Sequence, residues 1–142
     1  MAEIFLSKVI TKTIKTAPIE ELIQLYKEAG WWASSYDNEP EFLNYIVKDS
    51  ALFVGAFLDK KLIGMGRALS DLASDAYLQD IAVLTEFRGK GIGKKIIQTL
   101  IETLKENNVD WIGLVAQPGT FSFYKELGFE ILEDHVPLKY KG

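Results

Sequence analysis

Hydrophobic and polar residues alternate at the start of the chain before their spacing changes to that of a helix. Residues 8–15 (KVITKTIK) alternate apolar and polar side chains, which predicts a β-strand. Pro18 starts a helix with apolar residues at helical spacing, and Gly30 ends it. Asn38 is placed to cap a second helix, with Pro40 in its first turn and apolar residues on one side: Phe42, Leu43, Ile46 and Val47.

Three apolar runs in the middle of the chain predict consecutive strands. Residues 51–58 (ALFVGAFL) and 62–69 (LIGMGRAL) flank a turn-like segment, 59–61, and therefore predict a hairpin. Residues 76–84 (AYLQDIAVL) predict the next strand. A glycine-rich loop then leads into a helix whose apolar residues keep a helical spacing: Ile92, Ile96, Ile97, Leu100, Ile101 and Leu104.

The last third of the chain predicts a buried strand at 111–116 (WIGLVA), a short helix at 120–127 stopped by Gly128, and one or two closing strands from Phe129 onward. The order β-α-α-β-β-β-α-β-α-β indicates an α/β sandwich built on a mixed sheet. A chain of 142 residues has the size of one ordinary domain, so we expect residues 1–142 to form a single domain.

Composition and charge narrow the classes of partner. Hydrophobic residues make up 48% of the chain and charged residues 25%, which is an ordinary globular balance. No apolar run approaches the ~20 residues that span a bilayer, and charge interrupts the N-terminal stretch too early for a signal peptide, so we expect a cytoplasmic protein without a membrane partner.

The net charge of −4 argues against nucleic-acid binding. The absence of cysteine excludes a thiolate zinc site and a cysteine nucleophile, and we expect no metal.

The segment Arg88-Gly89-Lys90-Gly91-Ile92-Gly93 carries the clearest chemical signal in the sequence. Its three glycines fall on alternate positions between a predicted strand and a predicted helix, where a tight turn aims successive backbone N–H groups at one point. The helix that follows adds unpaired N–H groups and a positive dipole end, and Arg88, Lys90 and Lys94 add charge. The loop is therefore predicted to bind a phosphate or pyrophosphate.

Two common phosphate-binding patterns do not fit this loop. The P-loop pattern GxxxxGK[ST] would place its first glycine at Arg88 and its hydroxyl residue at Lys95. The dinucleotide pattern GxGxxG would need glycine where the chain has Lys94, and it belongs to the first strand of a βαβ unit, whereas this loop lies in mid-chain.

The loop matches the pattern R/Q-x-x-G-x-G/A, and here the sequence resembles the GNAT superfamily of N-acetyltransferases. The match is strongest over AYLQDIAVLTEFRGKGIGKKII, and a second matching part is FYKELGF at residues 123–129. The resemblance implies a mixed, mostly antiparallel sheet of six to seven strands with about four helices on its faces. More narrowly, IGMGRALSD at 63–71 followed by LQDIAV resembles small-amine acetyltransferases of the serotonin N-acetyltransferase type.

The resemblance also implies roles for individual residues. Acetyl-CoA would be the acetyl donor, with its pyrophosphate held by Arg88, Gly89, Lys90, Gly91, Ile92, Gly93 and Lys94. The backbone of Ile81, Ala82 and Val83 would pair with the pantetheine amides and polarise the acetyl carbonyl. Tyr124 would donate a proton to the leaving thiolate, or it is a packed aromatic residue of the helix face. Many members have an asparagine near the start of the last helix, where this chain has Gln117-Pro118-Gly119.

Asp80 is the carboxylate best placed to act as the base. An alkylamine with a pKa near ~10 must lose a proton before it attacks a thioester. Asp80 fills that role, or it is structural and binds backbone N–H groups or an arginine such as Arg67. Regular alternation places Asp80 on one face of its strand and both Tyr77 and Gln79 on the other, so either face can line the cleft, and a β-bulge would change this parity.

Aromatic residues are candidates for binding the amine that accepts the acetyl group. Trp31 and Trp32 lie in a segment that often folds over the acceptor pocket in the family, so together with Tyr77 and Gln79 they are candidates for binding the amine. The alternative is that the tryptophans anchor the connection between two helices. His135 is the sole histidine, and its place in a polar terminal turn removes it from the predicted site.

The predicted function is acetyl transfer from acetyl-CoA to a small primary amine within a ternary complex, because the chain has no cysteine to form an acetyl-enzyme. Two alternatives stay open: an enzyme that acetylates protein lysines or N-termini, and a sensor that binds acetyl-CoA without turning it over. A homodimer is possible.

Overall fold

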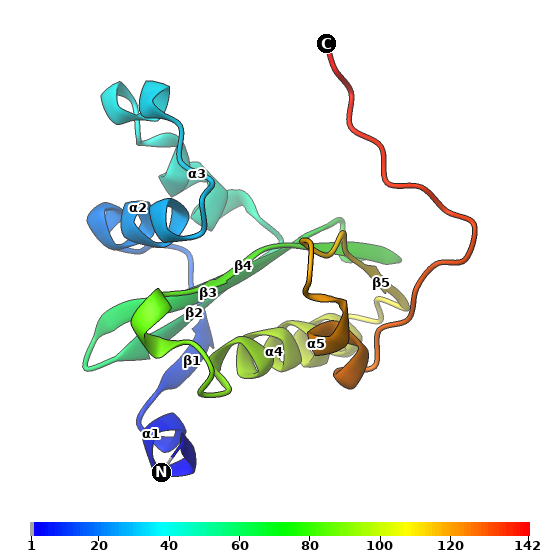
Figure 1. Ribbon diagram of the computed structural model, residues 1–142, viewed down its shortest axis with the longest axis horizontal. Coiled ribbons are helices and arrows are strands. Elements are labelled where there is room, and N and C mark those ends of the chain that lie inside the picture. The colour runs from blue at the N-terminus through cyan, green and yellow to red at the C-terminus, as the bar shows by residue number, and fades with distance from the viewer. Residues whose placement is uncertain (1) are drawn as a thin grey trace.

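The computed structural model describes residues 2–142, and a five-stranded sheet in the order β1-β2-β3-β4-β5 forms its centre (Figure 1). The strands are β1 (Ile10–Thr13), β2 (Leu52–Leu58), β3 (Lys61–Ser70), β4 (Asp75–Val83) and β5 (Trp111–Gly113). β1 to β4 pair antiparallel in sequence order, while β5 pairs parallel to β4. The predicted mixed, mostly antiparallel sheet is therefore confirmed.

Helices cover both faces of this sheet. α2 (Ile19–Glu28) and α3 (Phe42–Asp49) lie on one face, and α4 (Ile92–Glu106) and α5 (Phe121–Glu126) lie on the other (Figure 1). A further short helix, α1 (Ala2–Ser7), precedes β1, and two 3-10 turns, η1 (Ser34–Asn38) and η2 (Thr85–Phe87), lie in connections. The sequence pattern did not predict α1, so the structure has five α-helices where about four were expected.

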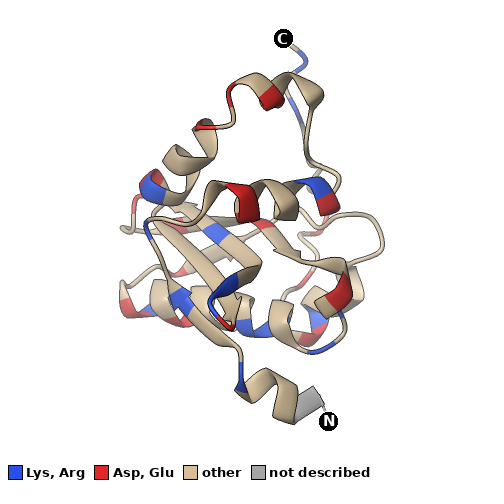
Figure 2. Ribbon diagram, turned by 90° about the vertical axis from the view of Figure 1, so that its left-hand side faces the viewer, with Lys and Arg blue, Asp and Glu red and all other residues tan. Residues whose placement is uncertain are grey.

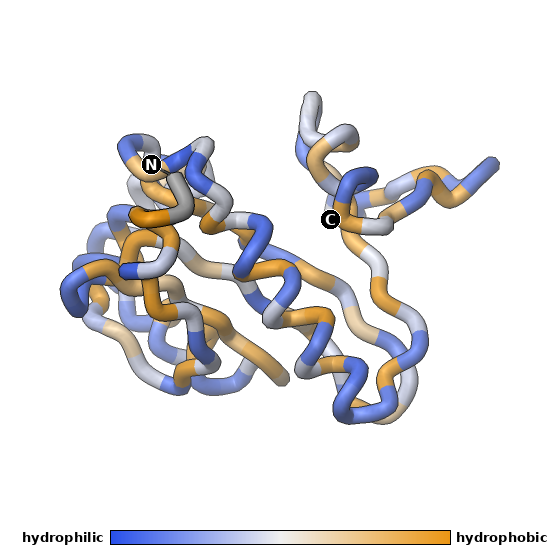
Figure 3. The backbone as a smooth tube through the Cα atoms, turned by 90° about the horizontal axis from the view of Figure 1, so that it is seen from below, coloured by the Kyte–Doolittle hydropathy of each residue, from blue (hydrophilic) through white to orange (hydrophobic). Residues whose placement is uncertain are grey.

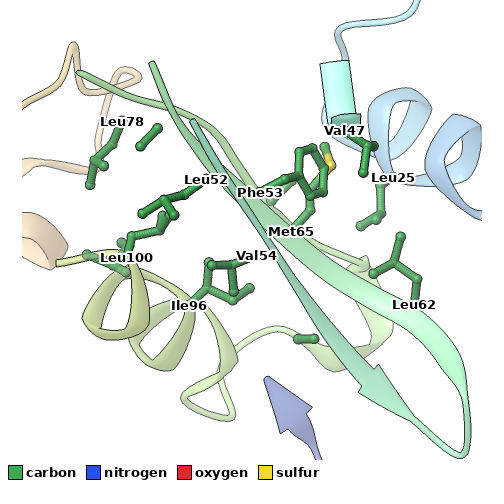
Figure 4. Close-up of a cluster of buried hydrophobic side chains, with 14 of the residues drawn as sticks. Leu25, Val47, Leu52, Phe53, Val54, Leu62, Met65, Leu78, Ile96 and Leu100 are labelled. Carbon is green, nitrogen blue, oxygen red and sulfur yellow. The ribbon is translucent and has the colours of Figure 1, made fainter. Parts of the chain in front are cut away.

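The core has two halves, one on each face of the sheet (Figure 4). Phe53 and Met65 point toward α2 and α3, while Leu52 and Val54 point toward α4, because side chains alternate along each strand. α4 is amphipathic, with hydrophobic and hydrophilic positions alternating along its coil (Figure 3), and its buried residues are those of the predicted helical stripe: Ile92, Ile96, Ile97, Leu100 and Leu104.

β3 lets α4 approach the sheet closely because glycines replace side chains on that face. A Cβ atom at Gly66 would lie 2.6 Å from Cδ1 of Ile81 and 2.8 Å from Cγ2 of Ile96. A side chain at position 66 would therefore have to push these isoleucines aside. This contact fixes α4, and therefore the loop before it, against the middle strands.

The number of strands was overestimated. The predicted closing strands after Phe129 are absent from the described residues, and the chain beyond α5 runs as an extended segment away from the sheet (Figure 1). A strand needs a neighbouring edge for its backbone hydrogen bonds, and this segment turns away from β5 at Asp134, whose φ is +59°. The sheet therefore has five strands, not six to seven.

The connection between α2 and α3 also differs from the expectation. Asn38 lies at the end of η1 and does not cap α3, which begins at Phe42 after Glu41 and has no side-chain cap. The reason is that an aromatic group, Trp32 with Tyr36 and Phe42, packs together here and draws the chain into a 3-10 turn.

Candidate functional site

The loop between β4 and α4 exposes a series of free backbone donors. Within the described chain, the N–H groups of residues 89–94 have no intramolecular hydrogen-bond acceptor, and α4 has no side-chain cap. Gly89 and Gly91 have φ values of +76° and +87°, which side chains disfavour. Free donors at a helix N-terminus form an anion-binding arrangement, so the loop has the predicted geometry.

Contacts from β4 and from α1 hold this loop. The guanidinium of Arg88 donates from Nε to the carbonyl of Val83 at 2.9 Å, which ties the loop to the end of β4. On the other side, the rings of Phe5 and Phe87 stack with centroids 5.9 Å apart, and Lys90 Nζ lies 5.5 Å from the ring centroid of Phe5. The helix α1 therefore braces η2 and the loop, which sequence reasoning missed.

Glu28 links α2 to the same loop. Its carboxylate accepts from the N–H of Thr85 at 2.8 Å and also from Gln24. These hydrogen bonds lower the pKa of Glu28, with the bond from Thr85 as the largest cause. Over the chain as a whole, blue and red residues are interspersed along the ribbon (Figure 2).

A β-bulge interrupts β4 at Asp80. Met65 pairs with Ala82 and Arg67 pairs with Gln79, so Gly66 faces two residues, Asp80 and Ile81. Asp80 has a φ of +55°, which is unusual for a residue with a side chain. The bulge turns the Asp80 side chain to the same face of the sheet as the Gln79 side chain. Regular alternation along the strand would have placed them on opposite faces, and it fails at this point.

Two donors hold the Asp80 carboxylate on that face. Tyr26 donates its hydroxyl to Oδ2 at 2.7 Å, and Arg67 donates Nε to the same oxygen at 2.8 Å. The side chains of Arg67 and Asp80 are 16% and 19% exposed, so the ion pair lies at the edge of the core. The Arg67 partner was among the sequence-based alternatives, whereas nothing in the local pattern indicated Tyr26.

The strands β4 and β5 separate next to this bulge. They pair only from Asp75 to Tyr77, opposite Trp111 to Gly113, and the edge of β4 beyond Tyr77 has no strand partner within the described residues. A pocket of about 310 Å³ opens where they separate. Its lining comes from α2's C-terminal connection, from β4 and from the residues after β5: Trp31, Tyr77, Leu78, Gln79, Asp80, Leu114, Val115 and Gln117.

Most of the predicted acceptor residues meet at this pocket. Trp31, Tyr77 and Gln79 line it beside Asp80, and the amide oxygen of Gln79 accepts from Arg67 at 3.3 Å. Trp32 is not among the lining residues, since its Nε1 donates to Asp37 and its ring stacks on Phe42. Trp31 therefore lines the pocket, whereas Trp32 packs in the aromatic cluster with Tyr36 and Phe42. Leu114, Val115 and Gln117 were missed because the separation of β4 from β5 is a tertiary feature.

Tyr124 lines a second, larger cavity of about 1120 Å³. This cavity shares Tyr77, Leu114 and Val115 with the first, so the two adjoin. The ring of Tyr124 packs edge-on against Phe123 and Phe129, and burial raises the pKa of its phenol. The hydroxyl therefore stays protonated at and above neutral pH, as a proton donor must.

The hydrogen bond from Tyr26 to Asp80 predicts a specific pH dependence of stability. Burial, and then the Asp80 carboxylate, raise the pKa of Tyr26, so the tyrosine is ionised more easily in the unfolded chain. Its stabilising contribution is complete below the ordinary tyrosine pKa of about 10 and is lost as the pH rises above it.

We therefore expect Tyr26→Phe to lower the free energy of unfolding by about 1.5–3 kcal/mol at pH 7 and to weaken the loss of stability between pH 9 and 11. Tyr45→Phe, at an exposed tyrosine, is the control and should follow the wild type. Denaturant unfolding across this pH range measures both effects. An equally steep alkaline loss in Tyr26→Phe would contradict the assignment.

Comparisons with known proteins agree with this geometry. The family described as "Acetyltransferase (GNAT) family" matches residues 17–129. An uncharacterized N-acetyltransferase, ycf52, of Pyropia yezoensis is 33% identical over 119 residues, which cover 81% of this chain and 66% of that protein. Histone acetyltransferase TAP1 of Glycine max is 44% identical over 71 residues, 50% of this chain and 31% of that protein.

A solved structure shows the same fold. PaiA N-acetyltransferase of Thermoplasma acidophilum, in complex with coenzyme A, superposes with a TM-score of 0.71 at 23% identity, over 87% of this chain and 90% of that one. The chain thus spans just under two thirds of the first relative and under one third of the second. No helix within residues 2–142 is long and apolar enough to cross a membrane. The match to the family covers residues 17–129, which is most of the chain, and the chain therefore belongs to the acetyltransferase (GNAT) family.

Proposed function

We propose that this protein transfers the acetyl group of acetyl-CoA to a primary amine of a small molecule, directly within a ternary complex. The observation that carries the proposal is the free edge of β4, which runs from the Asp80 pocket toward the loop of unpaired N–H groups. A cofactor with a pyrophosphate at one end and a reactive group at the other fits such an arrangement. The sequence has no cysteine, which favours direct transfer.

The residues of the loop fit the pyrophosphate of acetyl-CoA. Residues 89–94 offer six consecutive free N–H groups, and Lys90 and Lys94 add positive charge beside them. Arg88 contributes by holding the loop against Val83. Acetyl-CoA would supply the thioester, and the backbone of Ile81, Ala82 and Val83 borders the gap in which its pantetheine arm would lie. The coenzyme A bound to PaiA supports this use of the fold.

Two side chains provide the proton transfers. Asp80 takes a proton from the ammonium group of the acceptor, directly or through a water, so that the neutral nitrogen can attack the acetyl carbon. Tyr124 donates its hydroxyl proton to the sulfur as the carbon–sulfur bond breaks, and the proton that the nitrogen loses as the amide forms restores the tyrosine hydroxyl. Arg67 and Tyr26 both bind Oδ2 of Asp80, and no hydrogen bond within the described residues uses Oδ1, which leaves that oxygen for the amine.

The acceptor pocket favours a small amine. Its volume of about 310 Å³ suits a small molecule, and Trp31 and Tyr77 present aromatic surface beside the Asp80 carboxylate. An amine with an apolar or aromatic body fits this combination by cation-π contact and stacking. The proposed acceptor residues are thus Trp31, Tyr77 and Gln79, while Trp32 has a packing role. The resemblance to serotonin-type enzymes belongs to this proposal, as does a cytoplasmic location.

A protein acceptor is the second candidate, favoured by one observation. TAP1 of Glycine max is named a histone acetyltransferase. A panel of small amines and of lysine peptides, assayed with acetyl-CoA under the same conditions, separates the two. Faster turnover of lysine peptides than of any small amine would replace the small-molecule proposal.

Gly91→Val tests the cofactor loop. Valine at a φ of +87° costs about 1–3 kcal/mol, so the loop should leave its conformation and coenzyme A should bind roughly tenfold more weakly or worse. Asn108→Val introduces similar strain at a φ of +64°, beyond the opposite end of α4 from the loop, and should retain wild-type affinity. Isothermal titration calorimetry gives both values, and unchanged affinity in Gly91→Val would remove the loop from the site.

Tyr124→Phe tests the proton donor. Turnover should fall by more than about tenfold, within the usual range for general acid catalysis, with little change in cofactor affinity. Tyr45→Phe again serves as the control. Steady-state rates under conditions where chemistry limits turnover decide the outcome, and a rate equal to wild type would leave Tyr124 a packing residue.

Asp80→Asn tests the base. If Asp80 accepts the proton, the variant should turn over slowly at neutral pH and recover partly at high pH, where more amine is already neutral. A purely structural Asp80 predicts a loss of about 1–3 kcal/mol in stability without a change in the pH profile. Asp75→Asn, on an exposed side chain of the same strand, controls for the loss of a carboxylate. Destabilisation without recovery at high pH would count against the catalytic role.

A further inference from the structure

The loop of residues 88–93, called here the cofactor loop, has few contacts of its own to fix its shape. The N–H groups of residues 89–94 find no acceptor within the described chain, so no backbone hydrogen bond from these donors orders the loop. Three of these six residues are glycines, which lose the most conformational freedom when they are ordered. A loop that becomes ordered only when its ligand binds gives weaker binding, so contacts from outside the loop decide how well it is prepared.

The helix α1 supplies several of these outside contacts. The ring of Phe5 stacks on Phe87, immediately before the cofactor loop, with centroids 5.9 Å apart and ring planes 20° apart. The Lys90 ammonium lies 5.5 Å from the centroid of the same Phe5 ring. Leu6 lies beside Gly91, since a Cβ atom at Gly91 would be 3.5 Å from Cδ2 of Leu6. Two neighbouring residues of α1 therefore contact this stretch at three positions.

α1 is itself fixed to the core of the domain. The N–H of Lys8 donates to the carbonyl of Phe5, and the N–H of Val9 donates to the carbonyl of Leu6, both at 3.0 Å. Val9, directly before β1, is buried in the core. Figure 1 shows α1 beyond the start of β1, near the turn that leads into α4. The contacts to the cofactor loop thus come from an element that is anchored through Val9.

The matched part of the chain does not provide these contacts. The family match covers residues 17–129, and α1 precedes that range. The hydrogen bonds that tie this region to α2 and β4 end at Thr85 and Arg88, so they do not reach Lys90 or Gly91. Support at these two positions comes from α1.

We propose that α1 holds the cofactor loop in its binding conformation, and that Phe5 is the positioning residue, acting through Phe87 and Lys90. The inference rests on the proposed function, because it takes this loop to bind the phosphates of coenzyme A. Phe5 itself contacts no cofactor atom in this account. By keeping Lys90 and the glycines beside it ordered in the free protein, Phe5 removes part of the entropy loss that accompanies binding.

Local order in the free protein tests the first half of this proposal. Phe5→Ala removes the ring and should lower the NMR order parameters of the backbone amides at residues 89–91, which report motion on the ps–ns timescale. Ile4→Ala removes an apolar side chain of the same helix that is 61% exposed, and it should leave these order parameters unchanged. Phe5→Tyr keeps the aromatic ring and should resemble the wild type.

Coenzyme A affinity tests the second half. Because Phe5→Ala removes an aromatic pair and a cation-π contact, coenzyme A should bind about fivefold to tenfold more weakly by isothermal titration calorimetry. Ile4→Ala and Phe5→Tyr should retain the wild-type Kd. The KM for the acceptor amine at saturating acetyl-CoA should not change in Phe5→Ala, since α1 contributes no residue to the acceptor pocket.

A helix that only stabilises the domain gives a different result. Phe5→Ala would then lower the free energy of unfolding in denaturant, while the coenzyme A Kd and the order at residues 89–91 stayed at their wild-type values, and the proposal would be overturned. An equal loss of affinity in Ile4→Ala would overturn the role of Phe5 as well. In a Lys90→Met background, Phe5→Ala should weaken binding by a smaller factor, and an undiminished factor would exclude Lys90 as the route.

Gly91→Val separates failure of this inference from failure of the proposed function. If Gly91→Val loses coenzyme A affinity and Phe5→Ala does not, the cofactor site stands and only the role of Phe5 is wrong. If neither variant changes the affinity, the loop is not the coenzyme A site and both proposals are wrong.

Discussion

The β-bulge at Asp80 and Ile81 is the constraint on which the arrangement of the site depends. It places a non-glycine residue at a φ of +55°, a conformation that costs about 1–3 kcal/mol and persists only when surrounding contacts hold it. Tyr26 and Arg67 provide those contacts through Oδ2 of Asp80. The carboxylate is therefore presented where β4 and β5 separate, and the strand continues toward the loop with Ile81 packed against α4.

The far end of β4 is fixed by different contacts. Arg88 binds the carbonyl of Val83, Glu28 binds the N–H of Thr85, and Phe5 stacks on Phe87. Close packing at Gly66 holds α4 against the sheet. One strand thus connects the Asp80 carboxylate at the pocket with the row of free N–H groups in the loop, and contacts on each side hold both in place. A long ligand that reaches both would bind without a large rearrangement of the protein.

Local sequence predicted the parts of the structure that depend on local rules. The strand 76–84, the glycine loop and the stripe from Ile92 to Leu104 were identified from periodicity and from glycine spacing, and the structure confirms them. The bulge parity at Asp80 was not predictable, because it depends on how β3 pairs with β4. The division of Trp31 from Trp32 and the bracing of the loop by Phe5 also depend on tertiary packing. The closing strands predicted from Phe129 onward were wrong, because the segment after α5 turns away from the edge of β5 instead of pairing with it.

The claim that β4 and its loop form the coenzyme A site can be tested residue by residue with amide hydrogen exchange, measured by NMR in the presence and absence of saturating coenzyme A. The N–H groups of residues 89–94 have no acceptor within the described chain, so they should exchange rapidly in the free protein and slow markedly when the ligand's phosphates accept from them. Amides in the connection between β3 and β4, residues 71–74, which lies at the opposite end of β4 from the loop, should not change. Protection confined to other segments, with residues 89–94 exchanging at their free rate, would contradict the account.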